Sequence, residues 1–130
     1  MAERDDSKWI GASIARGTSG EAPLRVSTSY SGAIIEIPIF VLRGSEPGPR
    51  VFVTAAVHGD EINGTGAIRE IITGQPFKVL RGDVVLAPVV NIMGFEQHMR
   101  YMPDRRDLNR SFPGNAGGSL ASRMARSVYD

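Results

Sequence analysis

The clearest change in hydrophobic pattern along the chain occurs around residue 58. Residues 51–57 are apolar except for Thr54 and contain no glycine or proline, so they predict a strand buried on both faces. The pattern then takes a helical period, with isoleucines at positions 68, 71 and 72 followed by Gly74. A helix is therefore expected from about residue 60 to residue 74.

A second apolar run, residues 83–91, predicts another buried strand, in which Pro88 suggests a bulge or a bend. Two buried strands joined through a helix form a right-handed crossover, so they should be parallel. Asn91 is then expected at the same sheet edge as His58. Ligands of open α/β sheets bind at this carboxyl-terminal edge.

The N-terminal part of the chain is less regular. Residues 1–23 are polar and suggest an extension with at most one short element. Residues 24–42 alternate and then become strongly apolar, which predicts an antiparallel hairpin leading into a longer strand. The glycines and prolines of residues 44–49 predict a turn before the strand at 51–57.

The C-terminal part is predicted to be a long loop, residues 92–118, followed by a helix, residues 119–130. In that helix, apolar residues recur every four positions and Ser119 can cap the first turn. The predicted fold class is therefore α/β, a mixed sheet with flanking helices.

Composition narrows the possible functions. The 130 residues are 42% hydrophobic and 22% charged with a formal net charge of +1, which is typical of one globular domain and argues against nucleic acid as a partner. The absence of cysteine excludes disulfides, thiolate metal ligands and a cysteine nucleophile. No signal peptide or membrane span is recognisable, so we expect a cytoplasmic protein without a membrane partner. The oligomeric state cannot be read from the sequence.

His58 and Glu61 are candidate metal ligands. They stand three residues apart at the predicted turn from strand to helix, where an imidazole nitrogen and a carboxylate oxygen can reach one zinc ion. The same spacing also arises by chance, and Glu61 could instead favour the positive end of the helix.

A second segment makes the metal interpretation more specific. With HGDE at residues 58–61, the motif DLNRSFPG at residues 107–114 resembles the succinylglutamate desuccinylase and aspartoacylase family of zinc amide hydrolases, related to the zinc carboxypeptidases. The resemblance extends over residues 24–130. It implies that these residues form the N-terminal part of a catalytic domain with the zinc-carboxypeptidase-like fold.

The resemblance also implies roles for residues of the long loop. Asn109 and Arg110 correspond to the family's clamp for the carboxylate of the substrate, consistent with the planar fork of an arginine. Arg100 matches the arginine that stabilises the oxyanion of the tetrahedral intermediate. Asp104 and Asp107 are expected to fix the loop rather than to act on substrate.

His98, the second histidine, is expected to have a surface or loop role. In the family the third zinc ligand and the catalytic glutamate come later in the chain than residue 130, so we expect an incomplete site here. The implied function is zinc-dependent hydrolysis of an amide bond in N-acyl amino acids or similar small carboxylate substrates. The alternative is a non-catalytic module of the same fold that binds a small molecule or a metal.

Overall fold

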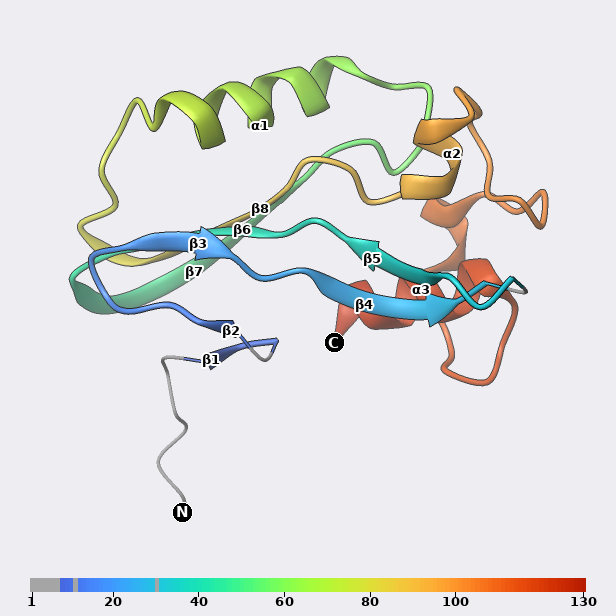
Figure 1. Ribbon diagram of the computed structural model, residues 1–130, viewed down its shortest axis with the longest axis horizontal. Coiled ribbons are helices and arrows are strands. Elements are labelled where there is room, and N and C mark those ends of the chain that lie inside the picture. Colours follow the sequence, from blue (N-terminus) through green and yellow to red (C-terminus); the bar gives the residue numbers. More distant parts are fainter. Residues whose placement is uncertain (1–7, 11, 30) are drawn as a thin grey trace.

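A four-stranded mixed sheet forms the centre of the structure, a computed structural model that describes residues 8–10, 12–29 and 31–130 (Figure 1). The strand order is β3-β6-β8-β7, and only β7 and β8 are parallel. The strands are β3 (Ser19–Glu21), β6 (Phe40–Arg43), β8 (Arg81–Ala87) and β7 (Glu46–Thr54). The predicted fold class and the parallel pairing of the two strands around the crossover helix are confirmed.

Helix α1 (Asn63–Gly74) is that crossover helix and covers one face of the sheet (Figure 1). Its buried Ile68 packs with Leu42, Ala55 and Leu86. Gly64 permits the close approach, because a Cβ atom at this position would lie 3.0 Å from the Cβ of Ala55. The predicted helix is confirmed, although it begins at Asn63 rather than at residue 60.

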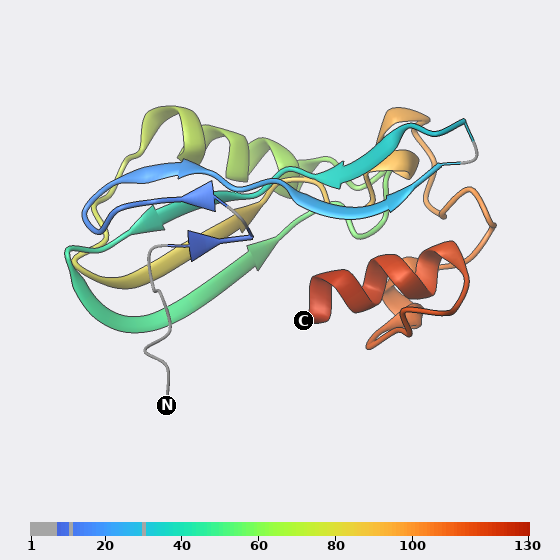
Figure 2. The ribbon, with the colours of Figure 1, turned by 60° about the horizontal axis from the view of Figure 1, so that its bottom comes forward.

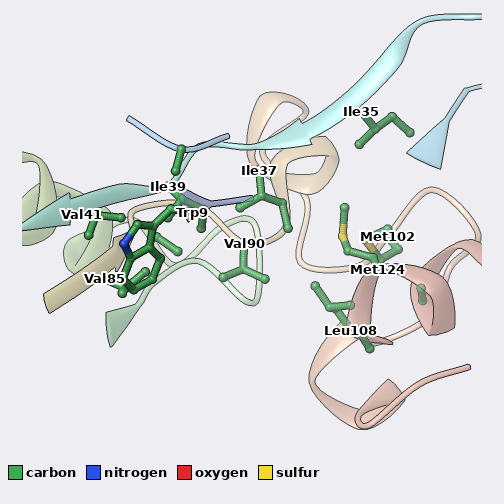
Figure 3. Packing of buried hydrophobic residues seen from close by; sticks show 14 of the residues in the cluster. Trp9, Ile35, Ile37, Ile39, Val41, Val85, Val90, Met102, Leu108 and Met124 are labelled. Carbon is green, nitrogen blue, oxygen red and sulfur yellow. The ribbon is translucent and has the colours of Figure 1, made fainter. Parts of the chain in front are cut away.

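The opposite face is covered partly by the N-terminal residues. Strands β1 (Lys8–Trp9) and β2 (Ala12–Ser13) form an antiparallel pair, and the Trp9 ring is buried with Val41 and Val85 (Figure 3). The prediction of at most one short element in residues 1–23 is wrong, because β3 is also a strand of the main sheet. Its sequence, Ser-Gly-Glu, carries no hydrophobic pattern from which pairing could be recognised.

A hairpin of β4 (Leu24–Thr28) and β5 (Ile34–Ile37) extends beyond the main sheet and packs with α3 (Leu120–Tyr129) (Figures 1 and 2). The hairpin and the C-terminal helix are confirmed, including the Ser119 cap, whose Oγ accepts a hydrogen bond from Ser122 N at 3.2 Å. The longer strand expected after the hairpin is instead divided into β5 and β6. Pro38 lies at the break, where it has no N–H to donate.

Strand β7 differs most from its prediction. We expected residues 51–57 to be buried on both faces, whereas every residue of β7 is exposed and the strand lies at the edge of the sheet. Phe52 is 45% exposed, whereas Ala55 and Ala56, which follow β7 in the predicted run, are buried. The apolar run identified a strand, but burial depends on neighbouring elements that a local pattern does not specify. β7 also begins at Glu46, within the segment predicted to be a turn.

The connection that follows β8 is more ordered than predicted. β8 ends at Ala87, so the strand is shorter than the predicted residues 83–91, and Pro88 lies at a bend, one of the two outcomes predicted for it. Within the predicted loop 92–118, α2 (Ile92–Glu96) and the 3-10 helix η1 (Leu108–Ser111) form short elements. Leu108 and Met102 bury their side chains against Met124 of α3, which fixes the loop in place (Figure 3).

In the part of the chain that the structure describes, no helix has the length and apolar character needed to cross a membrane.

Candidate active site

His58 lies on the turn that follows β7, and this turn is held to the end of β8. Ala56 has a positive φ of 52°, an uncommon conformation for a residue with a side chain. The Ala56 carbonyl accepts a hydrogen bond from Asn91 N at 2.9 Å. Asn91 therefore lies at the same sheet edge as His58, as the crossover predicted.

The loop after α2 packs directly on this turn. A Cβ atom at Gly59 would lie 2.2 Å from the carbonyl carbon of Gly94 and 2.3 Å from the Met99 oxygen, so only glycine fits. Gly59 N and the side-chain amide of Asn91 both donate to the Arg100 carbonyl oxygen, each at 3.4 Å. These contacts fix the backbone of Arg100 beside His58.

The His58 ring lies between two carboxylates. Its Nδ1 is 3.0 Å from Glu61 Oε1, and its Nε2 is 3.0 Å from Asp107 Oδ1. His58 is buried, whereas the Glu61 side chain is 60% exposed. The two side chains approach one another as expected, and their role as ligands of a single ion stays a prediction.

Asp107 is the part of this arrangement that the sequence did not predict. Its side chain accepts from Asn109 N at 2.9 Å and caps η1, which confirms the expected role in fixing the loop. Its contact with His58, 49 positions away, was missed. The only sequence signal for it was membership of the DLNRSFPG motif.

The pKa of Asp107 is lowered. Burial alone would raise the pKa of this carboxyl, but the hydrogen bond and the charge of His58, the Asn109 N–H and the charge of Arg100 together outweigh burial. Asp107 is therefore ionised at neutral pH and can only accept hydrogen bonds. The His58 nitrogen that faces it, Nε2, must carry the proton.

Arg100 completes the group, which we call the His58 cluster: His58, Glu61, Arg100 and Asp107. Its Nη1 donates to Glu61 Oε1 at 3.3 Å, so the guanidinium and the imidazole face the same carboxylate oxygen. Arg100 is exposed on its outer side. The cluster thus combines two candidate metal ligands with a cation that solvent and a small molecule can reach.

The remaining predicted residues lie at the border of this cluster or outside it. Arg110 is 87% exposed, and its Nε lies 3.8 Å from Asp107 Oδ2, while Asn109 is exposed beside it. Asp104 accepts from Arg106 N and Ala121 N, which confirms its role in the loop. His98 is exposed, as expected.

The donor set at His58 suits a metal ion in part. An imidazole nitrogen and a carboxylate oxygen converge, and Asp107 orients the ring from its far side, as carboxylates do for histidines that bind zinc. Asp107 faces the opposite ring nitrogen and so cannot join them on one ion. Among residues 8–10, 12–29 and 31–130, no three His, Asp or Glu side chains are arranged to hold a metal.

Comparisons with known proteins find a matching family model and a similar deacetylase. Residues 47–129 match the model of the succinylglutamate desuccinylase/aspartoacylase catalytic domain. The chain is 33% identical over 104 residues to the N-alpha-acetyl-L-2,4-diaminobutyric acid deacetylase of Halomonas elongata, an alignment that covers 79% of this chain and 30% of the deacetylase.

Two solved structures show the same fold. An aspartoacylase family protein from Mesorhizobium loti superposes with a TM-score of 0.77 at 26% identity, over 88% of this chain and 36% of that one. A succinylglutamate desuccinylase/aspartoacylase from Rhodobacter sphaeroides superposes with a TM-score of 0.69 at 34% identity, over 84% and 34%. The chain thus spans about a third of the length of the relatives it matches.

Proposed function

Because the chain belongs to the succinylglutamate desuccinylase/aspartoacylase family, we propose that it forms part of a zinc-dependent hydrolase that cleaves the amide bond of N-acyl amino acids or similar small carboxylates. The proposed zinc ligands are His58 Nδ1 and Glu61. The observation that carries the proposal is the 3.0 Å distance between His58 Nδ1 and Glu61 Oε1. The other nitrogen of the His58 ring, Nε2, contacts Asp107. Residues 24–130 are proposed to be the N-terminal part of the catalytic domain.

Asp107 prepares His58 for this role. Because the ionised carboxylate accepts from Nε2–H, the tautomer that leaves a lone pair on Nδ1 is favoured when the ring is neutral. Any proton on Nδ1 lies between the ring and Glu61 and must leave when a metal binds, so binding should weaken as the pH falls.

Arg100 is proposed to stabilise negative charge that develops on the substrate. A bound zinc ion supplies a Lewis acid and lowers the pKa of its water. The Arg100 guanidinium, 3.3 Å from Glu61, adds a donor on the same side of the cluster. Removing one such donor from an oxyanion site typically costs about 3 kcal/mol in the activation free energy.

Asn109 and Arg110 are proposed to bind the substrate carboxylate. Among the described residues, Arg110 is paired only with Asp107, whose Oδ2 lies 3.8 Å from Arg110 Nε, and its side chain is 87% exposed. A substrate carboxylate can therefore take both of its outer N–H groups. η1 holds the two residues next to Asp107, so a small substrate could reach the His58 cluster while its carboxylate remains bound here.

A second candidate function is a non-catalytic module that binds a metal or a small molecule. It is favoured by one observation: the described residues supply two candidate zinc ligands, whereas catalytic zinc sites have three protein ligands. A further ligand and a proton shuttle would have to come from outside the described residues.

Zinc affinity and amine release together test these two functions. We expect the 130-residue chain to bind zinc weakly, as measured by competition with a chromogenic chelator, and to release amine from N-acyl amino acids at background rates. His58→Ala and Glu61→Gln should each remove the zinc binding. If the natural protein continues beyond residue 130, the longer protein should hydrolyse these substrates, and the same substitutions should abolish turnover.

His98→Ala is the matched control, because it removes the second histidine, which is exposed on a loop of the same region. It should leave zinc affinity unchanged. Zinc binding that survives His58→Ala but is lost in His98→Ala would refute the assignment of the ligands. Zinc binding by a longer protein with no turnover would favour the second function.

A further inference from the structure

A cavity lies away from the His58 cluster, between the β4–β5 hairpin and the start of α3. Its volume is about 670 Å³, within the range of small-molecule sites. Thr28 and Ser29 line one side, and Ser119, Leu120 and Arg123 line the other. Figures 1 and 2 show the hairpin alongside α3.

The cavity contains a cation without a counter-ion. Arg123 is half-buried on α3, and its Nε–H is buried with no hydrogen-bond partner in the part of the chain that the structure describes. A guanidinium N–H that is buried without a hydrogen-bond partner is unfavourable, and an anion placed beside a partly buried charge gains more than it would in water.

The one carboxylate that lines the cavity does not compensate Arg123. Asp104 Oδ1 accepts from Arg106 N at 3.2 Å, and Oδ2 accepts from Ala121 N at 3.2 Å. Asp104 Oδ2 also lies 3.8 Å from Arg106 Nε. Asp104 is therefore committed to the loop and to the helix start, and the two lining arginines leave the cavity with a positive balance.

The rest of the lining is apolar and indicates what the anion should carry. Ile35, Met93, Pro103 and Leu120 form the non-polar wall, and Ile35 belongs to the buried cluster shown in Figure 3. A fully hydrated ion such as phosphate would leave this wall unused. A carboxylate attached to a short aliphatic chain satisfies both the guanidinium and the wall.

We propose that this cavity binds a small aliphatic carboxylate, with Arg123 as its principal cation and Arg106 at its rim. The ligand contacts none of the residues assigned to metal or substrate at the His58 cluster, because none of them lines the cavity. The site is therefore independent of the proposed hydrolysis.

The test uses hexanoate as the probe and hexanamide as its uncharged analogue. Each is titrated into the ¹⁵N-labelled chain, and amide shifts of residues 119–123 are followed. We expect saturable shifts with hexanoate and at least about tenfold weaker binding of hexanamide, the difference made by one charge-assisted contact.

Arg123→Leu should weaken hexanoate binding about tenfold or more. Arg126→Leu is the matched control, because Arg126 lies on the same helix, is paired with Asp130 and does not line the cavity. Its affinity for hexanoate should be unchanged. Arg123→Gln, which keeps a polar side chain of intermediate length, provides a second variant if the leucine variant does not fold.

Three results would overturn the proposal: no saturable shift with hexanoate, equal affinity for hexanamide, or unchanged affinity in a folded Arg123 variant. The last two would mean that the cavity takes up apolar molecules without using the guanidinium. None of these results depends on zinc, so failure here is distinguishable from failure of the proposed hydrolase function.

Discussion

Two charged groups lie along the path of strand β7, one at the middle of the strand and the other past its C-terminal end, and they differ in how far their side chains are exposed. The first, which we call the Asp83 cluster, consists of Arg43, Arg50 and Asp83, which pair across three neighbouring strands of the sheet. The second is the His58 cluster, built from loops beyond the strand ends. The carboxylate that two side chains share is buried in the Asp83 cluster and exposed in the His58 cluster.

In the Asp83 cluster, every charged group is matched by a partner on an adjacent strand. Arg43, with 1% of its side chain exposed, donates from Nε to Asp83 Oδ1 at 3.0 Å. Arg50 donates from Nε and Nη2 to Asp83 Oδ2 and stacks on Trp9 at 3.8 Å. Asp83 is buried and both of its carboxylate oxygens are paired, so we infer a structural role for this network, although the Arg50 side chain is 51% exposed.

In the His58 cluster, by contrast, the Glu61 and Arg100 side chains are exposed, while His58 and Asp107 are largely buried. Glu61 Oε1 faces both the imidazole and Arg100 while more than half of its side chain meets solvent. An exposed carboxylate with two donors can exchange them for a metal or a substrate at little structural cost. This difference indicates that a structural ion pair is distinguished from a candidate active site by the burial of its charged groups and by whether each group is paired. The presence of charge alone does not distinguish them.

The largest expected effect is that of Asp83→Ala. It leaves two arginines without their carboxylate, one of them fully buried, and should lower the free energy of unfolding by about 3–5 kcal/mol. Urea denaturation measures this. Glu46→Ala is the control, because its pair with Arg81 is exposed on both sides and should contribute less than about 0.5 kcal/mol. Similar losses of unfolding free energy in the two variants would show that the buried and the exposed ion pairs contribute equally to stability.

Asp107→Asn should have the next largest effect, on binding rather than on folding. The amide keeps the shape of the cap but loses the charge that holds the Nε2 proton, so zinc affinity should fall about 10- to 100-fold. Chelator competition measures the change. Asp104→Asn, in the same loop and without contact to His58, should bind zinc normally, and an equal loss in both variants would indicate disturbance of the loop instead.

The smallest effect is expected between the two clusters, on β7 itself. Phe52→Ala should cost less than about 1 kcal/mol in unfolding free energy, because the side chain lies at an exposed sheet edge. Leu86→Ala on β8, where the side chain is 1% exposed, should cost about 2–5 kcal/mol. A large loss for Phe52→Ala would show that β7 is covered in solution.

The sequence predicted where helices and strands form better than it predicted which segments pack against them. Isoleucines at helical spacing located α1, and the βαβ rule placed Asn91 beside His58. The same reasoning treated β7 and β8 as equally buried, because both are apolar runs, although one is an edge strand and the other is central. A local pattern reports what a strand can bury and not what lies against it.

Within the site, contacts between residues close in the sequence could be predicted, and contacts between distant residues could not. His58 and Glu61 are three positions apart, so the turn alone predicted their approach. Asp107 reaches His58 across 49 positions, and Asp83 reaches Arg43 across 40. Contacts of this kind depend on how loops and strands pack, and no local signal in the sequence specified them.

The orientation of the His58 ring offers the most direct test of the central claim that this histidine is a metal ligand held by Asp107. Two-bond ¹H–¹⁵N spectra of the imidazole rings, recorded with and without zinc, report which nitrogen carries the proton. We expect zinc to shift the Nδ1 signal of His58 while Nε2 stays protonated, and we expect no change at His98. A zinc-dependent shift at Nε2 of His58, or at His98 alone, would contradict it.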